Sequence, residues 1–432
     1  MKNRADLVAA IDLGSDSVRA VLARVPEKAG GKEPPEELEV LAVGQASSQN
    51  AIQYGEVVRE AGAAEAVRQA VEEMEQTAGV EVTHAWVTAG SRSRRSINSS
   101  GTVTVPDRTR PISAQDVHRA VQSAIPRAGG WLRPPYELLH ALPQEFWVDD
   151  LDATDDPIGW SGERIQSFVH LIACPRSVLE AVEKAVNGAG LAVEGTARGG
   201  PVASPLAAGY GVLSREERGG DVLLLDIGAM TVDIAVFRRG VLWHSDVMPS
   251  GARAYTTDLV RGLGISQTVA ERTKRRYGVA LVESVTADEL IELEGVGRTS
   301  SSFLPRRIVA EILQQRAMSD FLKIRDQLQK ALSSGLPRQI VLTGGGARLE
   351  GLSEVARVVF SRESESRGPT DISGQRDIAS QRQFAGAVGL ARYGARQQHL
   401  RAARRPSLGF GPMFSSVTGP FRRFAVRFRK AQ

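Results

Sequence analysis

Two short segments of the 432-residue chain place an aspartate and a glycine directly after a run of apolar residues. Asp226 and Gly228 follow Val222-Leu-Leu-Leu, and a second alternating apolar run then leads to Phe237. This pattern predicts a β-hairpin with its polar groups at the bend. A glycine lets backbone approach an anion, turn N–H groups can donate to that anion, and a carboxylate can hold a hydrated Mg²⁺ beside it. The bend is therefore predicted to bind phosphate.

The same arrangement occurs near the N-terminus. Asp12 and Gly14 end the apolar run that begins at Val8, and Ser17 stands where the later copy has Thr231. A single strand ending in Asp-x-Gly is common in ordinary turns, but two copies indicate two duplicated halves. We expect both aspartates to hold Mg²⁺ through water. The predicted phosphate and Mg²⁺ residues are Asp12, Gly14, Ser15, Ser17, Asp226, Gly228 and Thr231.

A third apolar strand, beginning at Gln339, opens onto Gly344, Gly345 and Gly346, and a segment with helical spacing follows it. Two hairpins and a late glycine turn, in this order, resemble the actin/Hsp70/sugar-kinase ATPase superfamily. The resemblance implies an α/β, two-lobed actin-like fold of duplicated ribonuclease-H-like domains. It also implies ATP or ADP as a ligand, with Mg²⁺, and adenosine supported by the three glycines.

Composition excludes several other classes of protein. Nine of the 54 Lys and Arg lie in residues 396–432, which contain no Asp or Glu, so the remaining 45 are outnumbered by 50 acidic residues. The basic character belongs to a tail, which argues against a nucleic-acid-binding domain. Cys174 is the only cysteine, which leaves no disulfide or thiolate metal site. No secretory signal and no apolar run long enough to span a bilayer are expected.

A segment inserted into the first half makes the resemblance more specific. A strand at 84–90, a helix at 113–124 capped by Ser113, and strands at 136–148 and 165–173 predict a small strand-helix-strand-strand module. The order, with the motifs around His140 and Gly159, resembles the insert that distinguishes the bacterial FtsA cell-division family. This resemblance covers about residues 5–395.

The FtsA resemblance implies roles for further residues. Glu271 and Lys274 resemble a ribose-binding pair, although their spacing alone also fits an ordinary helix ion pair. Arg306 resembles the position that meets the C-terminal peptide of the tubulin-like protein FtsZ. Ala229 and Met230 stand where the superfamily usually has glycines, so we expect nucleotide binding with slow turnover; the general base cannot be located. A basic cluster in the insert, Arg92, Arg94 and Arg95, is interpreted as a solvated loop.

The tail has a pattern of its own. Residues 396–415 read as a flexible linker, whereas residues 416–432 place aromatic rings on one helical face and basic groups on the others. Such an amphipathic helix is typical of membrane-surface binding, with a partner-binding helix or a nucleic-acid arm as alternatives. The predicted membrane-binding residues are Phe421, Arg422, Arg423, Phe424, Arg427 and Phe428.

The predicted domains follow from these assignments. Lobe one comprises 1–82 and 175–200 (subdomain 1A), with the insert at 83–174 (subdomain 1C). Lobe two comprises 201–248 and 331–395 (subdomain 2A), with 249–330 as subdomain 2B.

The resemblance implies a peripheral protein on the inner face of the cytoplasmic membrane at the division septum. It would tether FtsZ filaments, assemble into filaments with other copies of itself, and recruit later division proteins through the insert. Two alternatives share the fold: a membrane-associated scaffold of another machine, such as a pilus, and a small-molecule kinase.

Overall fold

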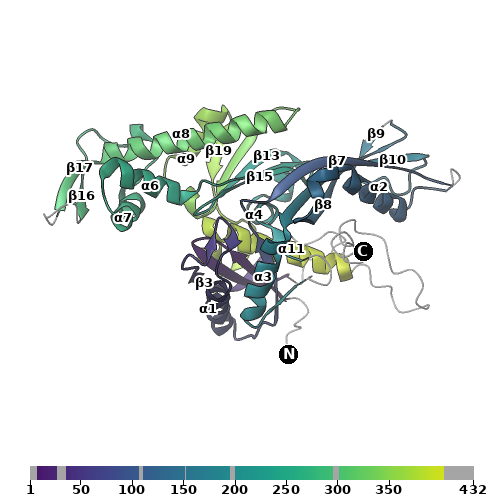
Figure 1. Cartoon of the computed structure of the whole chain (residues 1–432), viewed down its shortest axis with the longest axis horizontal. Coiled ribbons are helices and arrows are strands. Elements are labelled where there is room, and N and C mark those ends of the chain that lie inside the picture. Colours follow the sequence, from purple (N-terminus) through teal and green to yellow (C-terminus); the bar gives the residue numbers. More distant parts are fainter. Residues whose placement is uncertain are drawn as a thin grey trace.

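The computed structural model describes residues 7–26, 36–106, 110–150, 152–194, 200–294 and 301–402. Its first lobe, which contains α1, α3 and β3 in the lower part of Figure 1, is built on a mixed sheet. In this sheet β6 pairs parallel to β1, and β1 pairs antiparallel to β2. The strand order is β11-β6-β1-β2-β3-β20, with β12 beside β6. The strands are β1 (Leu7–Leu13), β2 (Ser17–Arg24), β3 (Leu38–Ser47), β6 (His84–Ala89), β11 (Ala192–Val193), β12 (Val202–Ala203) and β20 (Ile372–Gly374).

Helices cover both faces of this sheet. Helices α1 (Glu60–Ala78) and α3 (Arg176–Gly188) bury an Ala- and Val-rich stripe against one face. Helices α4 (Ser204–Val212) and α11 (Ala385–Ala402) lie on the other face. A short hairpin of β4 (Ile52–Gln53) and β5 (Glu56–Val57) precedes α1. These layers hold the β1–β2 bend in place.

The second lobe repeats the plan. Its sheet has the order β15-β14-β13-β18-β19, with β13 antiparallel to β14 and parallel to β18. Helices α6 (Ala252–Leu263), α7 (Gln267–Tyr277), α8 (Arg306–Ala331) and α9 (Leu352–Phe360) contribute to its core. The strands are β13 (Asp221–Ile227), β14 (Val232–Arg238), β15 (Val241–Met248), β18 (Gln339–Thr343) and β19 (Glu363–Ser366), and β16 (Leu290–Glu294) and β17 (Ser301–Pro305) form a separate hairpin. The duplication predicted from the two Asp-x-Gly strands is confirmed.

The insert contains β7 (Arg95–Thr104), α2 (Ala114–Arg127), β8 (Tyr136–Val148), β9 (Asp152–Thr154) and β10 (Arg164–Pro175). Its sheet has the order β7-β10-β8-β9, and Ser113 caps α2 in a capping box with Asp116. One assignment was wrong: the strand at 84–90 is β6 of the lobe-one sheet, and the insert begins with β7. The polar β7 sequence buries only Gly101 and so lacks the alternation that would have predicted a strand.

One predicted boundary also changes. Helix α11 continues to Ala402, past Arg396, where we predicted a linker to begin. No helix among the described residues is both long and apolar enough to cross a bilayer. The predicted membrane-binding helix at 416–432 lies outside the described residues.

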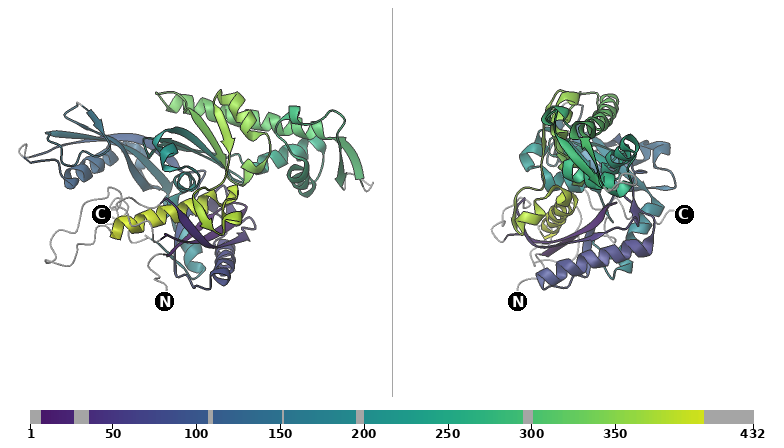
Figure 2. Two further views of the ribbon diagram at one scale, coloured as in Figure 1. Left: turned by 180° about the vertical axis from the view of Figure 1, so that it is seen from behind. Right: turned by 90° about the vertical axis from the view of Figure 1, so that its left-hand side faces the viewer.

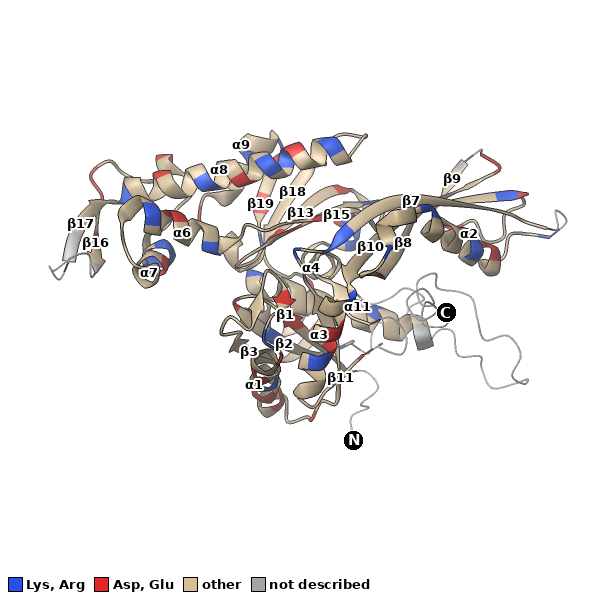
Figure 3. Cartoon of the chain, in the orientation of Figure 1, with Lys and Arg blue, Asp and Glu red and all other residues tan. Residues whose placement is uncertain are grey.

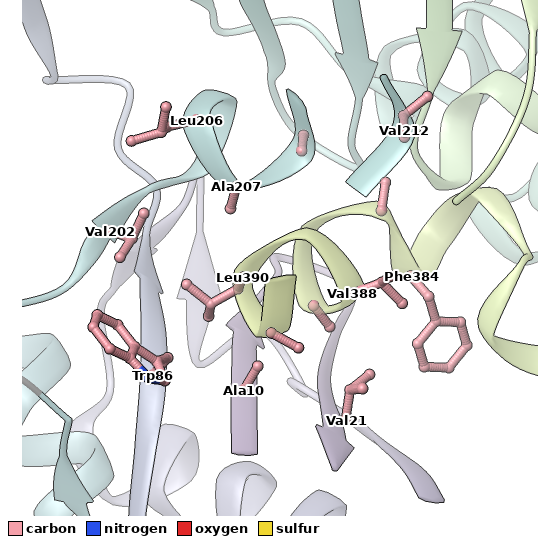
Figure 4. Packing of buried hydrophobic residues seen from close by; sticks show 14 of the residues in the cluster. Ala10, Val21, Trp86, Val202, Leu206, Ala207, Val212, Phe384, Val388 and Leu390 are labelled. Carbon is pink, nitrogen blue, oxygen red and sulfur yellow. The ribbon is translucent and has the colours of Figure 1, made fainter. Parts of the chain in front are cut away.

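Helices α4 and α11 pack against each other between the two sheets (Figure 2). Around them, Leu390 and Val388 meet Trp86, Ala10 and other apolar side chains (Figure 4). The helices approach closely because small residues face each other: a Cβ on Gly389 would lie 1.8 Å from the carbonyl oxygen of Ala207.

We expect Gly389→Ala to destabilise the protein by about 3 kcal/mol or more, because the methyl group meets backbone that cannot move aside as a side chain could. Urea unfolding followed by circular dichroism measures the change. Gly219→Ala is the control, since a Cβ there has no neighbour within 4 Å, and should shift stability by less than about 0.5 kcal/mol. Equal stability of the two variants would contradict the proposed close contact.

Candidate nucleotide site

The first hairpin holds Asp12 at the end of β1, inside the junction between the lobes. The Thr88 hydroxyl donates to Asp12 Oδ1 (2.7 Å), and the Leu13 N–H donates to Thr88 Oγ1 (3.1 Å). Gly386, near the start of α11, allows that helix to approach, since a Cβ there would lie 2.8 Å from Asp12 Oδ2. Burial raises the pKa of Asp12, against the lowering effects of the Thr88 hydrogen bond and Arg19. A nearby cation would therefore stabilise the ionised form of the Asp12 carboxylate.

The second hairpin places Asp226 in the corresponding position of β13. Gly344 has φ +86° and packs against it, because a Cβ at Gly344 would lie 2.2 Å from Asp226 Oδ1. Burial raises the pKa of Asp226 to about 8, and the negative charges of Asp233 and Asp12 add to this effect. Asp12 thus influences Asp226 across the lobe junction, which brings the two predicted Mg²⁺ carboxylates into one electrostatic cluster.

The hairpin turns differ in how their polar groups are used. In the first turn the Ser15 hydroxyl accepts from the Gly55 N–H (3.0 Å), and the buried Ser17 hydroxyl has no partner among the described residues. In the second turn the Gly228 N–H donates to the Thr231 carbonyl (2.8 Å). The carbonyls of Gly228 and Ala229 accept from the first N–H groups of α6, at 2.9 and 2.8 Å. Both turns are therefore fixed by neighbouring backbone.

An arginine in the first hairpin was missed by the sequence analysis. Arg19 is paired directly with Asp12 in the β1–β2 register, and its Nε has no hydrogen-bond partner in the segments that the structure describes. Burial lowers its pKa, while Asp12, Asp16 and Asp226 raise it. Strict alternation along β2 from Ser17 was the signal that could have placed Arg19 on the same face as the site. Its guanidinium is well suited to a phosphate.

The residue directly before β7, where the chain enters the insert, is a second arginine of the site. The Arg94 side chain is 1% exposed, and its Nη2 lies 2.7 Å from Asp233 Oδ1 and donates to the Asp246 carbonyl (2.9 Å). Asp233 pairs with Asp226 across the second hairpin. The interpretation of Arg94 as solvated was therefore wrong, because packing of the insert against β15 buries it. Exposed Arg92 and Arg95 stack instead on Tyr54 and Tyr136.

Gln144 and His170 extend the docking of the insert onto β15. Gln144 Nε2 donates to the Trp243 carbonyl (2.6 Å), and His170 Nε2 lies 2.9 Å from the Ser245 hydroxyl. Burial lowers the pKa of His170 to about 3, so the imidazole is neutral at pH 7. The insert belongs covalently to lobe one, yet it rests on lobe two.

Glu271 and Lys274 form an ion pair along α7, as their i,i+3 spacing allows; the ribose-binding role stays a prediction. Lys274 Nζ donates to Glu271 Oε2 (2.7 Å), to the Thr256 hydroxyl (2.7 Å) and to the Ala252 carbonyl (3.0 Å). Burial disfavours the ionised form of Glu271, but bonds from Lys274 and Thr256 outweigh it and lower its pKa. Burial lowers the pKa of Lys274, against the opposing effect of Glu271. Thr256 was missed, and it joins this pair to α6.

The predicted adenosine glycines turn directly beside the second hairpin. Gly345 and Gly346 open a 3₁₀ turn, and a Cβ on Gly346 would lie 2.5 Å from Ile227 Cγ2. The Gly344 N–H donates to the Arg382 carbonyl (3.2 Å). Gln383, next in the chain, has a buried Oε1 without a partner among the described residues. The glycines and the Asp226 bend therefore form one compact unit.

Arg306 lies away from this cluster, at the start of α8. Its Nε donates to the Tyr277 carbonyl (2.9 Å) and its Nη1 to Glu289 Oε1 (2.8 Å), leaving the side chain 22% exposed. Charges of both signs continue along α8 (Figure 3). The predicted membrane-binding residues lie outside the described residues.

The residues present fit a nucleotide with Mg²⁺. Several of the buried polar atoms that have no hydrogen-bond partner among the described residues belong to the hairpins and the segments beside them: Ser17 Oγ, Arg19 Nε, Thr343 Oγ1 and Gln383 Oε1. The described residues contain no group of three His, Cys, Asp or Glu that could hold a metal ion by itself. A Mg²⁺ here would therefore depend on water and phosphate oxygens for most of its ligands.

The fold and the paired hairpins define an actin-like ATPase. The solved PilM-PilN type IV pilus biogenesis complex aligns with a TM-score of 0.61 at 17% identity, covering 90% of this chain and 98% of that chain. MreB 5 of Spiroplasma citri bound to AMPPNP aligns with a TM-score of 0.52 at 12% identity, covering 93% and 100%. At these identities the likeness shows the fold alone.

Sequence comparison identifies the family within this class. The family described as cell division protein FtsA matches residues 223–389, and the SHS2 domain inserted in FtsA matches residues 92–173. FtsA of Pseudomonas aeruginosa is 30% identical over 393 residues, spanning 91% of this chain and 90% of its own length. FtsA of Escherichia coli is 30% identical over 402 residues, spanning 91% of each. The chain belongs to the FtsA family of cell-division proteins.

Proposed function

We propose that this chain binds ATP with Mg²⁺ between its lobes and tethers FtsZ filaments to the inner face of the cytoplasmic membrane. The observation that carries the proposal is the pair of duplicated hairpins, whose buried carboxylates both have a raised pKa: burial raises that of Asp12, and burial together with the negative charges of Asp233 and Asp12 raises that of Asp226. Two buried carboxylates in one cluster disfavour each other's ionisation, so a bound cation is stabilised there.

Each group of site residues would bind a different part of the nucleotide. Asp12 and Asp226 hold Mg²⁺ through water, while Ser15, Ser17 and Thr231 face the phosphates from the two turns. Glu271 and Lys274 hold the ribose, and the three glycines support the base. When bound, ATP supplies negative charge that both lobes contact, which favours the closed arrangement. We expect slow turnover, because Met230 adds bulk at the second turn; its Sδ lies 3.8 Å from Arg253 Nη1.

Closed subunits would associate end to end, and the C-terminal helix would attach the filament to lipid. Linking many weak anchors raises the overall affinity without any new contact. The insert would contact neighbouring subunits and later division proteins. The sequence left two alternatives, a pilus-type scaffold and a small-molecule kinase. The relatives named above do not support either, because they are cell-division proteins that align with about 90% of this chain.

The FtsZ contact is tested with a fluorescent peptide of the acidic C-terminal tail of FtsZ. We expect Arg306→Glu to weaken peptide binding at least tenfold, because an attractive charge becomes a repulsive one. Fluorescence anisotropy at 0.1 M salt measures the affinity.

Arg307→Glu is the matched control, since Arg307 is exposed and, within the described part of the chain, pairs with Glu311 along the helix surface. Circular dichroism checks that loss of the Glu289 and Tyr277 bonds leaves α8 folded. Wild-type affinity in Arg306→Glu would remove Arg306 from the contact, and no binding by the unmodified protein at high peptide concentration would refute the tethering function.

A further inference from the structure

A buried arginine lies where the chain passes between the lobes. The chain leaves lobe one after α4 and enters β13, and it returns after β19 to β20, so the topology contains two crossings. We define the outgoing crossing as residues 210–220, which begin in the last turn of α4, and the returning crossing as 367–371. Arg392 of α11 sits between them with a side chain that is essentially inaccessible to solvent.

The Arg392 guanidinium donates to backbone of both crossings. Its Nη1 donates to the carbonyls of Tyr210 (2.5 Å) and Gly211 (3.3 Å) in the outgoing crossing. Its Nη2 donates to the carbonyls of Thr370 (2.5 Å) and Asp371 (3.3 Å) in the returning crossing. A planar guanidinium with donors on both sides suits this geometry, whereas a lysine ammonium reaches a single point.

Other charged contacts join the same two crossings. The Arg367 guanidinium in the returning crossing pairs with Glu217 in the outgoing one. Arg218 donates to both carboxylate oxygens of Glu36 (2.8 Å each), which lies just before β3 in lobe one. The Thr370 N–H donates weakly to the Gly211 carbonyl (3.4 Å). The crossings are therefore held to each other and to lobe one.

We infer that Arg392 is the pin of the hinge between the lobes, a positioning residue that keeps the two crossings in fixed relation while the lobes open and close. Four carbonyl oxygens accept from it, including two at the end of α4, where the helix dipole favours a cation. Burial lowers the pKa of Arg392 to about 10, so it remains charged at pH 7. Without the pin, each crossing can move separately.

The test measures the distance between the lobes directly. Spin labels are attached at Val58→Cys in lobe one and Val358→Cys in lobe two, which are 52% and 70% exposed. The native Cys174 is buried and its pKa is raised to about 12 by burial, so it stays unlabelled. Double electron–electron resonance then gives the distance distribution of the full chain with and without Mg-ATP.

We expect Arg392→Met, which keeps much of the volume but no donors, to broaden the distribution without nucleotide. Arg392→Lys should broaden it less, and it carries the test if Arg392→Met does not fold. Arg396→Met is the control, because Arg396 lies on the same helix and its guanidinium carbon lies over the Tyr210 ring, 6.0 Å from the ring centre, rather than at the carbonyls that Arg392 binds. A lower melting temperature with unchanged distances in both Arg392 variants would overturn the inference.

The second readout rests on the proposed nucleotide function. Release of a fluorescent ATP analogue should be about tenfold faster in Arg392→Met. Closure around the nucleotide must then order a more mobile hinge, and this entropic cost weakens the closed state. Absence of nucleotide binding by the unmodified protein would count against the nucleotide function and leave the distance comparison intact. Equal release rates, with the analogue bound by both proteins, would overturn the proposed effect of Arg392 on nucleotide release.

Discussion

Asp226→Asn is expected to weaken Mg-ATP binding about 100-fold while leaving the protein folded without nucleotide. The substitution keeps the size of the side chain beside Gly344 and removes the charge that would orient the water shell of Mg²⁺. Loss of a group that holds a metal through a second shell costs affinity by up to about this factor. Titration calorimetry with Mg-ATP measures the affinity.

The pH dependence separates this role from a purely structural one. The pKa of Asp226 is about 8 in the folded protein and 3.8 for an ordinary aspartate. A group whose folded pKa is raised stabilises the fold fully below its unfolded pKa, and that contribution is lost as pH rises through the folded value. Without Mg²⁺, the unmodified protein should therefore lose stability between about pH 4 and 8, and Asp226→Asn should lose less.

Mg-ATP should reverse this trend, because a cation favours the ionised carboxylate. Affinity of the unmodified protein should rise from pH 6 to 9, and the rise should be smaller in Asp226→Asn. Asp221→Asn is the matched control: it lies at the other end of β13, where it pairs with Arg238 at 2.6 Å. Unaltered Mg-ATP affinity in Asp226→Asn would show that the nucleotide does not bind at this hairpin.

The hairpins could be predicted from sequence because their information is local. A buried apolar strand, an Asp-x-Gly bend and a second apolar run are adjacent in the chain, and the two copies support each other. The pairing of Asp12 with Arg19 follows from the same hairpin register and was within reach. Prediction of the two-lobed fold therefore needed no long-range contact.

Arg94 could not be predicted in this way. It lies within a basic run, Arg92 to Arg95, that resembles a solvated loop, and only the packing of the insert on β15 distinguishes the buried member from its exposed neighbours. Without Arg94, Asp233 would be an unpaired carboxylate close to Asp226. Arg94 compensates the charge of Asp233, although it lies more than a hundred residues earlier in the chain. Such tertiary pairing leaves no periodic signal in the sequence.

Phe424→Glu is expected to release the protein from anionic liposomes almost as completely as ending the chain at Ser415. The predicted helix inserts its aromatic face into lipid and sets its arginines against the headgroups. Loss of one inserted ring costs about 2 kcal/mol of burial, and one added negative charge costs about 1 kcal/mol near an anionic leaflet. The combined loss corresponds to roughly 100-fold in affinity for a single helix.

Co-sedimentation with vesicles, with and without Mg-ATP, compares these proteins with Phe410→Glu. That control makes the same substitution in the tail, ahead of the predicted helix, so charge alone cannot explain a difference between the two variants. Mg-ATP should strengthen pelleting of the unmodified chain if closed subunits polymerise, because linked helices bind with avidity. Equal pelleting of Phe424→Glu and the unmodified chain would refute the aromatic face, whereas failure of every form to pellet would reassign the tail to a protein partner.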